Sequence, residues 1–101
     1  MPKPYEYMGL IIPFYANEHE PVHVHAKRQG RESRAELVLI GGKVVEVLFN
    51  PASGRLPLSP REMRHFQELV IARADEIVAK WIDFFVLHKP VASERLTRRL
   101  K

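Results

Sequence analysis

Three histidines lie close together in the N-terminal part of the chain, and histidine is the commonest protein ligand for metal ions. His19, His23 and His25 fall within seven residues, in a chain that has five histidines altogether. The segment from His19 to His23 also matches H-E-x-x-H, the pattern in which one helix presents two zinc ligands and a general base. Pro21 lies inside the required turn and disfavours helical backbone at Glu20. We therefore interpret the match to zinc peptidases as accidental.

An extended segment gives these histidines a different geometry. From Val22 onward apolar and polar residues alternate, which predicts a strand that turns its apolar side to the core and points His23 and His25 outward. Their β-carbons would lie about 7 Å apart, close enough for both imidazoles to reach one metal ion, and His19 would add a third ligand. Three histidines and a water around a divalent metal such as zinc would resemble a catalytic site. The alternative, which the sequence leaves open, is a set of polar strand residues that bind no metal.

A group of cationic side chains follows the histidines. Lys27, Arg28, Arg31 and Arg34 surround the turn after the predicted strand and are interrupted by Glu32. If this turn projects, its cations and the histidine side of the strand form one surface that suits phosphate groups. An ordinary solvated turn is the alternative interpretation, since such runs of charge are common.

Composition narrows the class of protein. The chain of 101 residues is 46% hydrophobic and 28% charged, which predicts one globular domain over residues 1–101. It has no cysteine, so disulfides and thiolate metal sites are excluded. Because the sequence shows no signal peptide and no apolar run of about 20 residues, we expect a cytoplasmic protein without a membrane partner. No phosphate-binding glycine loop and no G-x-S-x-G motif occur.

The formal net charge of +4 comes from one end of the chain. Residues 89–101 contain five cationic side chains and one carboxylate, so residues 1–88 are neutral overall. Nucleic-acid binding by the folded body would therefore depend on a local basic patch.

Residue patterns predict a few strands followed by a long helix. Apolar or alternating runs indicate strands at residues 8–15, 22–27, 33–40 and 43–49. Gly41-Gly42 provides the positive φ angles that a two-residue hairpin turn needs. Ser59 and Glu62 form an S-x-x-E capping box around Pro60, and apolar residues then recur at helical spacing until Pro90.

The predicted helix is too long and too apolar for the domain to cover it alone. About 29 residues would span about 44 Å, whereas a domain of this size is roughly 33 Å across, so the helix must bend, overhang or pair. Trp81, Phe84 and Phe85 belong to a segment that is apolar on more than one face, and we predict a partner interface there. The covering element is either a short C-terminal helix capped by Ser93 or a second subunit in a homodimer.

The histidine motif also suggests a family. The run from Asn17 to His25 resembles the D/N-x-H-x-P-x-H-x-H signature of a prokaryotic family known as domain of unknown function 4160. The positions that match this signature are His19, Pro21, His23 and His25. Glu20 and Val22 differ from the residues common in the family, so no role is transferred to them. The resemblance implies a compact α+β fold without an established activity, in toxin–antitoxin-like modules that pair with the product of a neighbouring gene.

Together these observations predict an α+β fold, with a small antiparallel sheet of three to four strands packed on one long C-terminal helix and a short basic C-terminal segment. The predicted function is a toxin–antitoxin-like binding module that engages a partner protein, nucleic acid or both through a histidine and arginine surface. The alternative is a metal-dependent hydrolase or nuclease that uses His19, His23 and His25. The sequence does not decide whether the protein is an enzyme.

Overall fold

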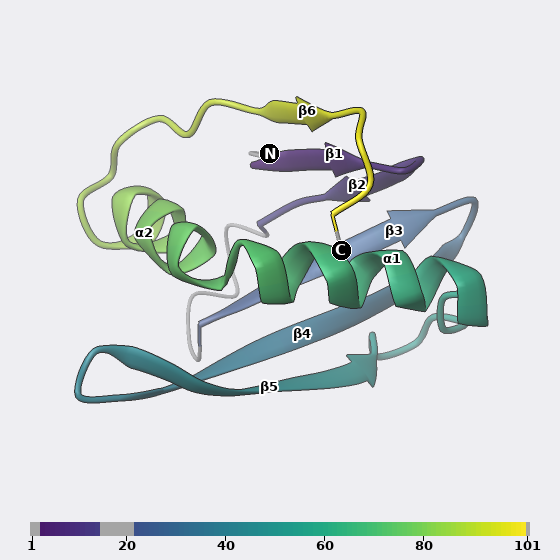
Figure 1. Ribbon diagram of the computed structural model, residues 1–101, viewed down its shortest axis with the longest axis horizontal. Coiled ribbons are helices and arrows are strands. Elements are labelled where there is room, and N and C mark those ends of the chain that lie inside the picture. The colour runs from purple at the N-terminus through teal and green to yellow at the C-terminus, as the bar shows by residue number, and fades with distance from the viewer. Residues whose placement is uncertain (1–2, 15–21, 101) are drawn as a thin grey trace.

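The computed structural model describes residues 3–14 and 22–100, and it has an α+β architecture in which two helices lie on one face of a sheet (Figure 1). The elements in chain order are β1 (Tyr5–Tyr7), β2 (Leu10–Ile12), β3 (His23–Arg28), β4 (Arg31–Ile40), β5 (Lys43–Pro51), α1 (Pro60–Ala72), α2 (Ala74–Phe85) and β6 (Glu94–Leu96). The described part of the molecule measures 33 × 30 × 27 Å. Within it, no helix is long and apolar enough to cross a membrane.

The strands form one mixed sheet in the order β5-β4-β3-β2-β1-β6. All neighbours are antiparallel except β1 and β6, which run parallel. Two-residue turns join three of the antiparallel pairs at Met8-Gly9, Gln29-Gly30 and Gly41-Gly42, and both residues of each turn have positive φ. Such turns match the right-handed twist of the flanking strands. The hairpin predicted at Gly41-Gly42 is confirmed.

The expected sheet of three to four strands is wrong, because the sheet has six. The predicted strand at residues 8–15 begins instead with the Met8-Gly9 turn, which separates β1 from β2. Gly9 has a φ of 84° and supplies the left-handed conformation that the second turn position requires. The apolar run hid this turn, since Met8 adopts a positive φ that a methionine rarely takes.

The single long helix is also wrong. The capping box at Ser59 is confirmed: its Oγ accepts a hydrogen bond from the Glu62 backbone N–H at 3.2 Å, and the Ser59 N–H donates to Glu62 Oε1 at 2.9 Å. The helical path then breaks at Arg73, whose φ of −120° and ψ of 20° lie outside the α region. The break turns α2 so that Ile77 and Trp81 enter the core, whereas a straight helix would overrun the 33 Å molecule.

The core lies between the sheet and the two helices. Val24 and Ala26 of β3 are fully buried there, together with Phe66 and Leu69 of α1. The ring of Phe49 on β5 meets that of Phe66 edge-on at 5.5 Å between centroids. Because side chains alternate across a strand, His23 and His25 belong to the opposite face of the sheet.

Two tyrosines of β1 connect the sheet to both helices. The Tyr5 hydroxyl donates a hydrogen bond to Glu76 of α2, and the Tyr7 hydroxyl donates to Glu68 Oε1 of α1 at 3.2 Å. Burial raises the pKa of Tyr5 far above its usual range, and the hydrogen bond to Glu76 raises it further. Tyr7 also accepts a hydrogen bond from the Leu100 backbone N–H at 2.7 Å. The hydroxyl of Tyr7 therefore ties α1, β1 and the C-terminal segment together.

The C-terminal segment packs on the domain as a strand. The short helix expected after Ser93 is wrong, because β6 pairs with the outer edge of β1 and the Glu94 N–H donates to the Pro4 carbonyl at 2.9 Å. The edge of β1 needs hydrogen-bond partners, and a strand supplies them where a helix would not. Leu96 and Leu100 are partly buried against the core, so the segment covers part of the apolar surface that the sequence left unexplained.

Candidate functional site

A depression of about 280 Å³ lies at the end of the β3–β4 hairpin and is lined by four cationic side chains. We call it the basic hollow, and its lining residues are Ile11, Lys27, Arg28, Gln29, Gly30, Arg31, Glu32 and Arg55. The cations come from three places: the end of β3, the start of β4, and the loop after β5. Guanidinium and ammonium groups around one concave surface suit the oxygens of a phosphate group.

The loop after β5 folds back along the start of β4 and brings Arg55 to the hollow. The Glu32 backbone N–H donates to the Leu56 carbonyl at 2.8 Å, and the Ala52 N–H donates to the Glu32 carbonyl at 3.2 Å. Arg31 Nη1 donates to the carbonyl of Pro57 at 3.1 Å. Sequence reasoning missed Arg55, and its only signal was an arginine in a loop rich in glycine and proline.

Arg28 extends from the hairpin toward the start of α1. Its guanidinium passes close to Gly9, where a β-carbon would lie 3.2 Å from Arg28 Nη1. Arg28 Nε is 3.9 Å from Glu62 Oε2. The hydrogen bond from the Ser59 backbone lowers the pKa of Glu62, and the charges of Arg28 and Arg31 lower it further. The carboxylate that caps α1 is therefore also held ionised by two cations of the hollow.

Arg34, the remaining predicted cation, lies elsewhere. It is opposite His25 on β3 and opposite Asn50 on β5, and it is half-buried. The structure thus brings Lys27, Arg28 and Arg31 together with Arg55, and it places Arg34 along the sheet face instead of in the hollow.

The two described histidines lie on the expected face of the sheet, but they are buried. His23 is 3% exposed and His25 is 4% exposed, and their ring centroids are 5.3 Å apart. The sequence suggested outward, solvated rings. β3 has a neighbour on each side, and the long side chains of Arg34 and Glu36 stand opposite the histidines on β4. The structure therefore buries two side chains that alternation alone would leave in water.

His25 has an acidic neighbour that the pattern did not single out. Its Nδ1 is 2.9 Å from Glu32 Oε2, and both side chains are at least nine-tenths buried. A carboxylate at Nδ1 fixes the orientation of an imidazole, which is the usual arrangement behind a metal-binding or proton-transferring histidine. Residues 3–14 and 22–100 contain no group of three histidine or acidic side chains placed to hold a metal ion. His19 lies outside the described residues, so the predicted site of His19, His23 and His25 stays a prediction.

The family assignment comes from a comparison with family models. The model of a domain of unknown function, DUF4160, matches residues 9–82. The chain belongs to the DUF4160 family. No curated protein and no solved structure matches the chain significantly.

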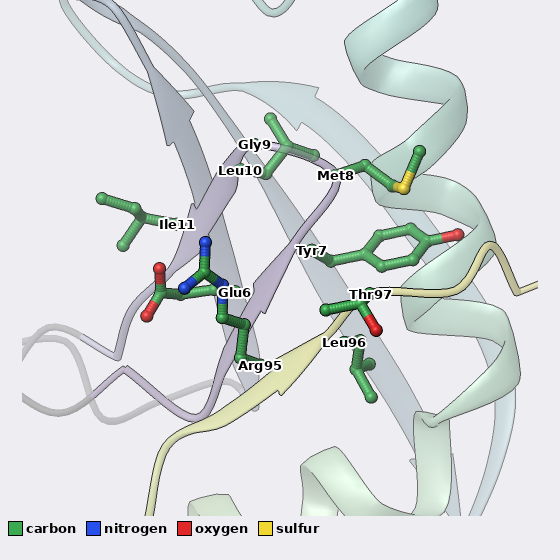
Figure 2. Close-up of a pocket in the computed structure, with 9 residues that line it drawn as sticks. All are labelled: Glu6, Tyr7, Met8, Gly9, Leu10, Ile11, Arg95, Leu96 and Thr97. Carbon is green, nitrogen blue, oxygen red and sulfur yellow. The ribbon is translucent and has the colours of Figure 1, made fainter.

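The DUF4160 match includes the basic hollow and both described histidines but leaves out β1 and β6. These two strands border a second depression of about 430 Å³, in which Glu6 and Arg95 stand opposite each other in register (Figure 2). Figure 2 also shows Tyr7 pointing away from these two side chains, toward α1. One carboxylate and one guanidinium balance the charge at this depression, so it is less suited to an anion than the basic hollow is.

The predicted partner interface at the end of α2 is largely an internal aromatic cluster. Trp81 is only 6% exposed, and its ring centroid is 5.0 Å from that of Phe85. Phe14 lies 6.3 Å from Phe84 and 5.9 Å from Phe85 between ring centroids. The large exposed apolar side chains at this end are Ile82, Val86 and Leu87. An interface role for Trp81, Phe84 and Phe85 remains a prediction, and Trp81 itself is part of the core.

The basic C-terminal segment is partly neutralised. Arg99 makes a two-pronged contact with Glu68 of α1, with Nη2 2.7 Å and Nε 3.1 Å from Glu68 Oε2. These hydrogen bonds lower the pKa of Glu68 to about 2. Arg99 therefore fastens the chain end to α1, while Arg95 and Arg98 are exposed.

Proposed function

We propose that this DUF4160 protein is a non-enzymatic module that binds nucleic acid through the phosphate backbone, with the basic hollow as the contact site. The observation that carries the proposal is that Lys27, Arg28, Arg31 and Arg55 all line one depression. Residues 1–88 have no net charge, so these four cations form a local basic patch on a body that is otherwise not basic.

The cations of this hollow suit the oxygens of a phosphate group. Hydrogen bonds from Ser59 and the neighbouring cations keep Glu62 ionised, and that carboxylate already occupies one side of Arg28. Arginine forks match the paired oxygens of a phosphate and remain charged at every physiological pH. The hollow is at the end of the β3–β4 hairpin, beside the start of α1 (Figure 1).

The rest of the sheet face that is turned away from the helices predicts binding without sequence preference. Glu6, Glu36 and Glu46 lie on that face by strand alternation, and no phenylalanine, tyrosine or tryptophan of the described strands shares it. Bases would find few aromatic rings to stack on. We expect few phosphate contacts and dissociation constants in the micromolar range or weaker, on the order of 10⁻⁶–10⁻⁴ M.

Fluorescence anisotropy with labelled RNA and DNA oligonucleotides at low salt tests the proposal. The double variant Lys27→Gln/Arg55→Gln should weaken binding at least tenfold. The matched control, Lys43→Gln/Arg98→Gln, removes the same charge from exposed positions outside the hollow. Lys43 is at the far end of β4 and β5, about 30 Å from the hairpin end that carries the hollow.

The outcomes separate a specific contact from general attraction. Loss of affinity in the hollow variant alone supports the proposal, and an equal loss in both variants would reduce it to non-specific charge. Absence of binding to either nucleic acid at low salt would refute it. The family resemblance makes the product of a neighbouring gene the second ligand to test, as expected for a toxin–antitoxin-like module.

A metal-dependent hydrolase or nuclease is the second candidate, and the contact between His25 and Glu32 favours it. We propose that His23 and His25 would hold a divalent metal such as zinc with His19, while Glu32 orients His25. Elemental analysis of protein purified without a polyhistidine tag should then give one metal per chain, lost in His23→Ala. A metal content near zero, unchanged after incubation with zinc, manganese or nickel, would remove this candidate.

A further inference from the structure

We propose that β5 pairs with β5 of a second copy of the chain, antiparallel and across a two-fold axis at Leu48, so that two sheets join into one. β5 ends the strand order and has nine residues, whereas the strand at the opposite edge, β6, has three. Short edge strands protect a sheet against further pairing, and long ones invite it.

The backbone of β5 turns specific groups outward. Leu37 of β4 donates its N–H to Val22, on the β3 side, so its antiparallel partner Val47 points its own N–H and carbonyl away from β4. Alternation gives Phe49 the same direction. The Ala52 N–H, which donates to the Glu32 carbonyl, has the opposite direction, as the alternation requires. Val47 and Phe49 thus offer complete donor and acceptor pairs at the outer edge.

Symmetry limits the register. A two-fold axis that relates two adjacent antiparallel strands is perpendicular to the sheet and keeps each side chain on its face, so one residue must face its own copy. With Leu48 at the axis, Val47 of each chain exchanges hydrogen bonds with Phe49 of the other. On the exposed face, Leu48 then meets Leu48, and Glu46 stands opposite Asn50.

The neighbouring registers are worse. An axis at Glu46 would oppose two carboxylates. An axis at Val47 would need a regular partner at Val45, where the β4–β5 ladder is bulged between Val38 and Leu39. An axis at Phe49 would place Val47 opposite Pro51, which has no N–H to donate.

The exposed face gives an apolar contribution to the same interface. Leu48, at the proposed axis, is 39% exposed. The only charged residues of β5 are Lys43 and Glu46, and Lys43 lies beyond the paired segment. A second copy, which brings the same apolar centre and the same outward groups, therefore matches this edge.

Cysteine cross-linking tests the register directly, because the chain contains no cysteine. Opposed residues of a non-hydrogen-bonded antiparallel pair have β-carbons about 4.5–5.5 Å apart, within reach of a disulfide. Leu48→Cys should give a covalent dimer under mild oxidation, at least tenfold faster than Glu46→Cys. In the proposed register the two copies of residue 46 are about 13 Å apart, although they are on the same exposed face.

Solution mass and a charge exchange complete the test. Light scattering should give twice the 11.7 kDa chain mass for the unmodified protein. Leu48→Lys and Leu48→Glu should each be monomeric, and their equimolar mixture should recover the dimer. Ile40→Lys, at a position 68% exposed and outside the pairing, should remain dimeric. A monomeric unmodified protein at high concentration, or cross-linking at residue 46 as fast as at residue 48, would overturn the proposal.

Discussion

Replacing Tyr7 with phenylalanine removes the one oxygen atom that joins the first strand, the first helix and the C-terminal segment. This oxygen accepts a hydrogen bond from the Leu100 N–H at 2.7 Å and donates one to Glu68 at 3.2 Å. We expect the first bond to contribute about 1 kcal/mol, and the second about 1 kcal/mol after allowance for its partial exposure and for the competing Arg99. Tyr7→Phe should therefore lower the free energy of unfolding by about 2 kcal/mol and Tm by about 8–16 °C.

Truncation isolates the part of this effect that depends on the C-terminal segment. In a chain without residues 94–101, Tyr7→Phe should cost only about 1 kcal/mol, because the bond to Glu68 alone remains. Urea denaturation of the four proteins gives the coupling free energy, which we expect near 1 kcal/mol. An equal cost of Tyr7→Phe in the full and truncated chains, or a cost below about 0.5 kcal/mol in the full chain, would refute this reasoning.

The cap of α1, the pair of Glu68 with Arg99 and the basic hollow can each be tested separately. Ser59→Ala removes the side-chain half of the capping box and should cost about 1 kcal/mol, measured by thermal denaturation, whereas Ser59→Asp should retain most of the stability. Because Arg99 lowers the pKa of Glu68 in the folded protein from 4.5 to about 2, the stabilisation by this pair is complete above about pH 4.5 and is lost as the pH falls toward 2. Glu68→Gln should therefore make Tm less dependent on pH in this window. An unchanged dependence of Tm on pH would contradict the assignment. If four phosphate contacts form at the basic hollow, raising the salt from about 50 to about 200 mM should weaken binding of single-stranded nucleic acid by the unmodified protein about 50-fold. The same change should weaken binding by Lys27→Gln/Arg55→Gln only about 7-fold. Equal salt dependence in the two proteins would exclude these two side chains from the contact.

Local features of the sequence predicted the elements that local interactions determine. The capping box at Ser59 and the turn at Gly41-Gly42 depend on residues within a few positions of one another, and both occur as expected. The break at Arg73 has no proline or glycine signal, because it reflects the length of the helix relative to the domain. Likewise the strand that replaces the expected C-terminal helix depends on an open edge that belongs to the other end of the chain.

The candidate site shows the same division. Three of the hollow's cations are near neighbours in sequence around the hairpin turn; the sequence grouped them with Arg34, which does not line the hollow. Arg55 comes from a loop whose position depends on backbone hydrogen bonds to Glu32, which no local pattern reveals. Alternation placed His23 and His25 on the correct face of the sheet, but alternation along one strand carries no information about how deeply that face is buried.

The pairing of β1 with β6 has a consequence for biosynthesis. Tyr5 meets Glu94, so two neighbours in the sheet leave the ribosome about 90 residues apart. Until β6 emerges, the outer edge of β1 has no strand beside it, and Tyr5 and Tyr7 lack their contacts with the C-terminal segment. Sheet completion is thus a late event in the life of each new molecule, and the interval before it is when chaperones and proteases have most access to this chain.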